Sequence, residues 1–117
     1  MKDFRSLTVW EKSHQITLSI YKLTHSFPKE EIYGLTSQIR RSSSSISINI
    51  AEGCGRGSDA DFARFLQISL GSASENEYLI LLSYELNYLQ KLDYENLLEQ
   101  IQQIKKMLTS LILKIRK

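Results

Sequence analysis

Apolar residues recur at alternating steps of three and four along most of the chain, the spacing that places side chains on one face of an α-helix. The pattern restarts three times, which predicts four helices over about residues 8–26, 36–53, 58–89 and 93–116. No stretch has the period of two that is typical of a half-buried strand. Short connections make neighbouring helices antiparallel, so the predicted fold is all-α: an antiparallel up-down four-helix bundle forming one domain over 1–117.

The predicted core follows directly from these apolar faces. They comprise Val9, Ser13, Ile16, Ile20, Leu23 and Phe27; Leu35, Ile39, Ser42, Ile46 and Ile50; Phe62, Leu66, Ser69, Ala73, Asn76, Ile80 and Tyr84; and Leu97, Ile101, Ile104, Leu108, Leu111 and Ile115. The helix ends carry capping signals. These signals are a capping box of Thr8 and Glu11, N-caps at Thr36 and Ser58, a C-cap at Gly53 or Gly55, and a hydrophobic staple between Leu92 and Leu97.

Antiparallel pairing around the glycine-rich turn at 53–57 predicts how the second and third helices meet. It places Arg41 level with Glu75, and Glu52 level with Arg64. The small residues 42–45 then face 71–74, so we expect these two helices to pack closely there. A bulky side chain in place of Gly71 should accordingly overpack the interface.

The third helix has more apolar surface than one face of a bundle helix needs. Between 78 and 89 its sequence is YLILLSYELNYL, and other helices add Trp10, Leu18, Tyr21, Ile48, Leu98 and Ile112 outside their apolar faces. Large exposed apolar patches mark interfaces, and closed homo-oligomers are the usual result. Self-association is therefore predicted; the alternative is that the third helix is central and the remainder are isolated surface residues.

Composition narrows the class of protein without naming an activity. The chain has 117 residues, 42% hydrophobic and 24% charged, with a net charge of +2. A single cysteine, Cys54, cannot form an internal disulfide, which favours a reducing compartment. The N-terminus lacks an apolar stretch and the longest apolar run, 78–82, is too short to span a bilayer, so we expect a cytoplasmic protein without membrane contact. The small basic clusters fit solvated helix faces, and the charge balance leaves nucleic-acid binding open.

No arrangement of residues predicts catalysis, a cofactor or a metal. His14 and His25 lie about three turns apart, unlike metal ligands on one helix. The Gly53-x-Gly-x-Gly57 segment lacks the preceding strand and the Lys-Ser/Thr of phosphate-binding loops, so it is interpreted as a helix-to-helix turn. Arg56 could lower the pKa of Cys54, but no histidine base lies nearby in the sequence. We therefore expect a protein that is not an enzyme and takes no small-molecule substrate.

Several segments resemble a known family. They are 7–10, 27–41, 45–53, Arg56, Phe65, Leu66, Gly71, Ser72 and Glu75. Together they resemble the bacterial four-helix-bundle family encoded by intervening sequences of 23S rRNA genes, which is related to accessory proteins of diversity-generating retroelements. The likeness covers most of the first three predicted helices, and the fourth by pattern alone. Members typically carry alanines and a proline where this chain has serines near 42–47, a change that keeps the side chains small.

The resemblance implies a homo-oligomeric bundle, a pentamer arranged as a ring. A related retroelement accessory protein forms such a ring and works with a reverse transcriptase and nucleic acid, so the implied partner is RNA or a ribonucleoprotein. The alternative is a protein-protein interaction scaffold with no nucleic-acid contact. The polar positions of the motif form either an interaction surface or a structural network between the second and third helices. They are Arg40, Arg41, Asn49, Glu52, Arg56, Arg64 and Glu75.

Overall fold

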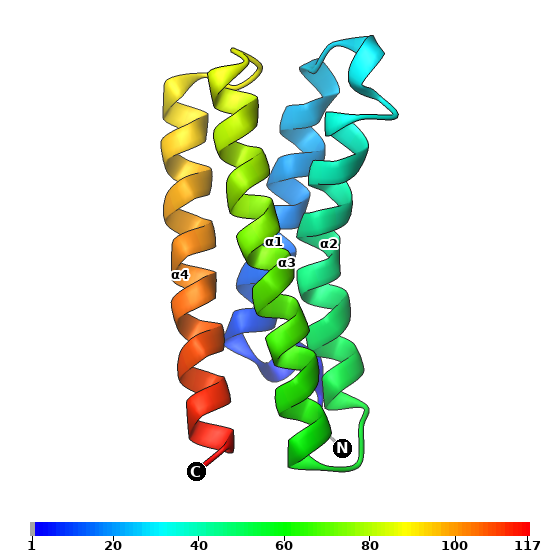
Figure 1. Ribbon diagram of the computed structural model, residues 1–117, viewed down its shortest axis with the longest axis vertical. Helices are drawn as coiled ribbons and strands as arrows, with labels where there is room; N and C mark the ends of the chain where they lie inside the picture. Colours follow the sequence, from blue (N-terminus) through cyan, green and yellow to red (C-terminus); the bar gives the residue numbers. More distant parts are fainter. Residues whose placement is uncertain (1) are drawn as a thin grey trace.

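The computed structural model describes residues 2–117 and contains four long helices aligned side by side (Figure 1). They are α1 (Thr8–Leu23), α2 (Leu35–Cys54), α3 (Asp59–Glu85) and α4 (Lys91–Ile115), with short 3-10 turns at Phe4–Ser6, Thr24–Ser26 and Lys29–Glu31. Successive helices run in opposite directions, and residues 2–117 contain no strand. The predicted all-α four-helix bundle is thus confirmed. None of the helices in the described range is long and apolar enough to cross a membrane.

The residues that cap the N-termini of the helices were only partly predicted from the sequence. Ser58 is the N-cap of α3, and its Oγ accepts a hydrogen bond from the Asp61 amide at 3.1 Å, as predicted. Thr8 lies inside α1 after an N-cap at Leu7 that makes no side-chain cap bond, so the capping box was wrong. The predicted cap at Thr36 was also wrong: α2 begins one residue earlier, and the Leu35 amide donates to Glu31 Oε1 at 3.1 Å.

Helix α3 ends four residues before the predicted limit. Asn87 has a positive φ of 66°, and asparagine tolerates this left-handed conformation better than most residues. The Asn87 amide donates to the Tyr84 carbonyl and the Tyr88 amide to the Ser83 carbonyl, both at 2.9 Å. This is the Schellman pattern of a helix C-terminus. Helix α4 then starts after an N-cap at Gln90, which places Leu92 inside the helix and leaves it 77% exposed, so the predicted staple does not form.

The predicted apolar faces form the core. Every predicted position is buried except for four that are only partly buried: Leu23, Tyr84, Leu111 and Ile115. Of the additional apolar residues in 78–89, Leu79 and Leu89 are also buried, whereas Tyr78, Leu81 and Leu86 are exposed. The central position of α3 in the bundle therefore explains part of its additional apolar residues, and the other part is exposed on the surface.

Among neighbouring helices, α2 and α3 form the most extensive interface of the bundle and α1 and α4 the least extensive. Polar side chains fix the register of α2 and α3. Asn76 Nδ2 donates to the Ile39 carbonyl at 3.2 Å, and Ser69 Oγ donates to the Ile46 carbonyl at 2.9 Å. This register agrees with the predicted pairing of the two helices.

The glycine that permits a tight contact between α2 and α3, however, is Gly53 at the turn and not Gly71. A Cβ atom on Gly53 would lie 2.9 Å from Phe65 Cβ and 3.0 Å from Phe62 Cδ1, so only glycine leaves room for these two phenylalanines. A Cβ atom on Gly71 would meet no atom within 4 Å. The expectation that Gly71 is packed against α2 was therefore wrong, because its side of α3 faces away from the core.

Candidate functional site

The end of the bundle that carries the α2–α3 turn also holds the N-terminal segment and the C-terminus of α4 (Figure 1). The Lys2 amide donates to the Cys54 carbonyl at 3.1 Å, and Lys2 Nζ lies 3.5 Å from a carboxylate oxygen of Asp59. These contacts fasten the N-terminal segment to the turn. As a result, residues from the two extremes and the middle of the sequence share one surface.

Phe65 holds two guanidinium groups at this end. The Arg56 and Arg64 guanidinium carbons each lie 4.7 Å from the centre of the Phe65 ring. Phe65 as a whole is only 6% exposed, whereas both arginines are exposed. Gly53 permits this arrangement because it lets the phenylalanine come against α2. Guanidinium groups that stack on a ring keep their edge N–H donors free for an anion.

Further cations lie in the segments that meet at this end of the bundle. Arg5 lies over the Phe4 ring with its guanidinium carbon 4.8 Å from the ring centre. We call the end formed by the segments 2–5, 52–64 and 114–117 the basic end (Figure 1). In the sequence these segments carry the cations Lys2, Arg5, Arg56, Arg64, Lys114, Arg116 and Lys117 and the acids Asp3, Glu52, Asp59 and Asp61. Cations outnumber acids there, although the whole chain has a net charge of only +2. Of the two arginines on Phe65, Arg64 also pairs with Asp61, at 3.6 Å.

Two of the seven predicted site residues have contacts inside the bundle. Arg40 Nε donates to Thr24 Oγ1 at 2.8 Å, and its guanidinium carbon lies 4.9 Å from the centre of the Tyr21 ring. It therefore joins α2 to α1, whereas the structural interpretation placed it between α2 and α3. Asn49 Nδ2 donates to the Ser45 carbonyl one turn earlier at 2.8 Å. These contacts give both residues a structural role.

Arg41, Glu52 and Glu75 are exposed on the outer side of α2 and α3. The register brings Arg41 level with Glu75, as predicted. None of the ion pairs formed within residues 2–117 joins α2 to α3, however. Whatever their role, these side chains do not form a charged network between the two helices.

Cys54 and the turn glycines have structural environments. Burial raises the pKa of the Cys54 thiol, and the nearby Lys2 ammonium only partly opposes this effect. The suggestion of a lowered pKa for Cys54 was thus wrong, because the net shift is upward. Gly55 is the C-cap of α2, which confirms that the glycine-rich segment is a helix-to-helix turn. Within 2–117 no cluster of three or more His, Cys, Asp or Glu side chains could hold a metal ion.

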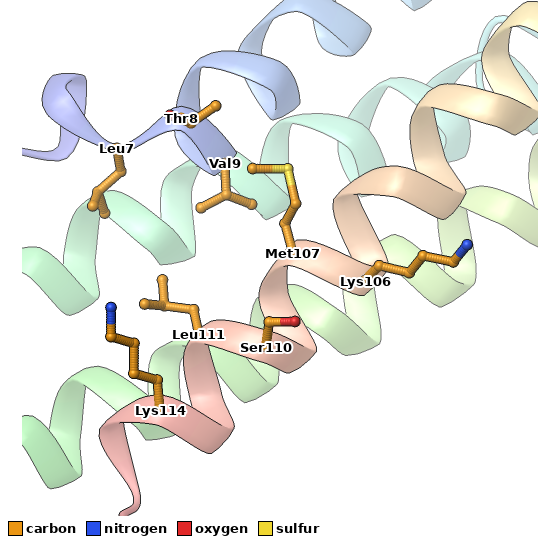
Figure 2. Close-up of a pocket in the computed structure, with 8 residues that line it drawn as sticks. All are labelled: Leu7, Thr8, Val9, Lys106, Met107, Ser110, Leu111 and Lys114. Carbon is orange, nitrogen blue, oxygen red and sulfur yellow. The ribbon is translucent and has the colours of Figure 1, made fainter.

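A second surface feature is an open groove between the start of α1 and the last turns of α4. It has a volume of about 430 Å³ and an apolar floor made by Leu7, Val9, Met107 and Leu111. In Figure 2 the Val9 and Met107 side chains point toward one another, and the Lys114 ammonium lies beside Leu7 and Leu111. The groove exists because α1 and α4 have the smallest interface among neighbouring helices of the bundle.

Sequence reasoning did not identify Phe65 as the support of two arginines, nor Lys2, Arg5 and the C-terminal cations as their neighbours. Phe65 was noticed only within the family motif. The missing information is spatial, because these cations lie at 2–5, 56–64 and 114–117. Only the up-down course of the helices brings the three segments to one end.

Comparison with known proteins identifies one matching family and a similar solved structure. Residues 5–110 match the model of the 23S rRNA-intervening sequence protein family. A crystal structure of a protein of unknown function from the S23 ribosomal protein family of Bacteroides thetaiotaomicron VPI-5482 has a TM-score of 0.82 and 33% identity; the match covers 89% of this chain and 94% of that one. No curated protein matches the chain.

Proposed function

The chain belongs to the 23S rRNA-intervening sequence protein family, and we propose that it is a non-enzymatic homo-oligomer that binds RNA or a ribonucleoprotein through its basic end. The observation that carries this proposal is the pair of guanidinium groups held on Phe65 among further cations. Phosphate contacts supply most of the affinity of proteins for nucleic acid, and arginine suits phosphate geometry. Both guanidinium groups lie within 4.7 Å of one ring centre, so they can serve the same or neighbouring phosphates.

Self-association would make such a surface effective. A monomer of this modest net charge is a weak partner for RNA, but several copies facing one way present several basic ends to one molecule. The exposed apolar side chains of Tyr78, Leu81 and Leu18 support association. Following the family resemblance, we propose a ring of five subunits.

The absence of enzyme activity is part of the proposal. Cys54 is the strongest nucleophile that the sequence offers, and it is 2% exposed. Burial also raises the pKa of its thiol, which disfavours the reactive thiolate. A metal or tightly bound cofactor in the purified protein would contradict this part of the proposal.

RNA binding is tested by fluorescence anisotropy with a labelled, structured 23S rRNA fragment at increasing salt. The variant is Arg5→Ala with Arg56→Ala, because both side chains lie on aromatic rings and neither forms an ion pair within residues 2–117. The matched control is Lys29→Ala with Lys91→Ala, which removes the same charge from exposed positions at the opposite end.

We expect the arginine variant to bind at least tenfold more weakly at low salt. The slope of log affinity against log salt should also fall by about two, roughly one for each lost phosphate contact. The lysine control should bind like the natural chain. Binding that is weak and independent of salt, or equally weakened in both variants, would overturn the proposal.

The α1–α4 groove favours a second candidate, a protein-interaction scaffold without nucleic-acid contact. Its apolar floor is the kind of surface that receives an amphipathic helix. A partner that stays bound after nuclease treatment, and is lost on Met107→Glu, would favour this function. Retained RNA binding by Met107→Glu would separate the two candidates.

A further inference from the structure

One side of α3 carries a stripe of residues that nothing in the chain covers. Arg64, Ile68, Gly71 and Glu75 follow one another at steps of four, three and four, and all are exposed. Ile68 is 42% exposed, and the position of a Gly71 Cβ is open on every side. Glycine inside a helix costs about 1 kcal/mol relative to alanine, and no neighbour in the chain requires it here. A bare backbone does allow another helix to come close.

Helix α1 also carries an outer stripe, with a projecting leucine at its centre where the α3 stripe has a glycine. Leu18 is 52% exposed and lies between Glu11 and Lys22, both also exposed. Their spacing of seven and four keeps them on one side of the helix. Leu18 therefore projects from α1 between an acidic residue earlier in the helix and a basic residue later in it.

The two stripes lie at the same height along the bundle. Ser13 bonds to Ser47 and Thr24 to Arg40, so Leu18, midway along α1 between those bonds, is level with about 43–44 of α2. The hydrogen bonds of Ser69 with Ile46 and of Asn76 with Ile39 place residues 43–44 of α2 level with about 71–72 of α3. Leu18 is thus level with Gly71.

The same two sets of bonds place the flanking charges. Glu11 of α1 falls within about one helical turn of the level of Arg64, and Lys22 within about one turn of the level of Glu75. Both pairs have opposite charges. The side-chain reach of these residues covers such an offset.

We propose that the outer stripe of α1 in one copy packs on the outer stripe of α3 in a second copy, with Leu18 seated on Gly71. Lys22 then meets Glu75 of the second copy, and Glu11 lies within about one helical turn of the level of Arg64, which stays on Phe65. The contact specifies the surface used in the self-association proposed above and rests on that proposal. It assigns Glu75 a partner that it lacks on α2 of its own chain.

This contact joins two different surfaces, so it is heterologous and repeats from copy to copy, giving a ring where the rotation between copies closes. Equal levels mean that the next copy needs no shift along the bundle axis, as a closed ring requires. Helices α1 and α3 each pack against both α2 and α4, so the two stripes lie on different sides of the bundle.

The choice of a protein partner for this surface follows from its charges. The α3 stripe starts at Arg64 in the basic end and continues to a carboxylate, Glu75, away from that end. A carboxylate repels a phosphate backbone, so RNA held at the basic end is not expected to follow the stripe to Glu75. A stripe of alternating charge around an apolar centre instead suits another helix of alternating charge.

The test is the mass in solution by light scattering, with four variants. Gly71→Leu fills the seat of Leu18, and its side chain has free space in the monomer, so the helical circular dichroism signal should stay unchanged. Lys22→Glu places two acids together, and Lys22→Glu with Glu75→Lys restores opposite charges. Leu92→Glu is the control, an equally drastic change at a 77% exposed leucine outside both stripes.

We expect Gly71→Leu and Lys22→Glu to associate at least tenfold more weakly, and the double charge exchange and Leu92→Glu to keep the mass of the natural chain. A monomeric natural chain would overturn self-association itself. An oligomeric natural chain whose mass withstands Gly71→Leu and Lys22→Glu would overturn only the α1–α3 contact, because assembly would then use another surface.

Discussion

Gly53 of α2 lies directly against Phe65 of α3, so closely that a Cβ atom on the glycine would be 2.9 Å from the Cβ of the phenylalanine. The contact brings the two helices together at their connecting turn. It also supports the ring on which Arg56 and Arg64 rest. Packing at a glycine thereby determines where two charged side chains are displayed.

Gly53→Ala should destabilise the protein by about 1–2 kcal/mol, because neither Cβ atom can move without shifting a backbone. Alanine is otherwise the better helix former, so a net loss isolates the steric term. The control is Gly55→Ala, where the nearest atom to an added Cβ is 3.5 Å away. Urea unfolding of both variants checks this. Equal stability of the two would mean that α2 and α3 can separate locally at little cost.

Asn76→Asp should cost about 3 kcal/mol or more at pH 7, because it places a charge at a fully buried position. The asparagine donates to the Ile39 carbonyl and the Ser42 hydroxyl, whereas a carboxylate has no proton to donate. Burial raises the pKa of such a carboxyl, so the variant should recover stability as pH falls toward 4 and lose it as pH rises. Unfolding at pH 4 and pH 7 measures this, with the exposed Asn96→Asp as control. A loss that is independent of pH would contradict it.

Glu77→Gln should lower the free energy of unfolding by up to about 1 kcal/mol at pH 7, because it removes the partly exposed ion pair with Lys105. The Lys105 hydrogen bond, at 2.8 Å, holds the pKa of Glu77 below its usual range. A lowered pKa in the folded state stabilises above the ordinary value of about 4.3, and that contribution disappears as pH falls further. The difference from the natural chain should therefore be constant near neutrality and vanish on acidification. Glu99→Gln is the control, at an exposed position that forms no ion pair within residues 2–117.

Glu31→Ala should lower the free energy of unfolding by about 1–2 kcal/mol, because the Glu31 carboxylate accepts two hydrogen bonds. Oε1 accepts from the Leu35 amide at the start of α2, and Oε2 accepts from the Tyr88 hydroxyl, both at 3.1 Å. Tyr88→Phe removes only the second bond, so it should cost about half as much. Thermal unfolding of both, beside the exposed neighbour Glu30→Ala, gives the comparison. A Tyr88→Phe loss as large as that of Glu31→Ala would mean that the helix cap contributes nothing.

The bond between Glu31 and Tyr88 also explains why the helix ends were harder to predict than the helices. Glu31 caps α2 from outside the predicted capping positions, and it is held there by a tyrosine 57 residues away. Local sequence signals do not contain such a contact. At Asn87, by contrast, a local signal for the end of α3 was present, but the apolar run around it continued the helical pattern.

The residues of the candidate site were likewise predicted only in part. The motif residues Arg56 and Arg64 were selected from the sequence, and both belong to the basic end. Arg40 and Asn49 were selected too, but their polar groups bond within the bundle. A sequence motif names polar positions without distinguishing a side chain that faces outward from one that bonds a neighbouring helix.

By itself, the sequence determined the number of helices, their order and the side each turns inward, because these depend on spacing along one helix. It also determined the register of α2 and α3, since a short turn leaves little freedom in their pairing. Only the tertiary structure decided which glycine is buried and which is bare, and which cations gather at one end. Those properties depend on distances between residues far apart in the chain, and the packing of all four helices sets them together.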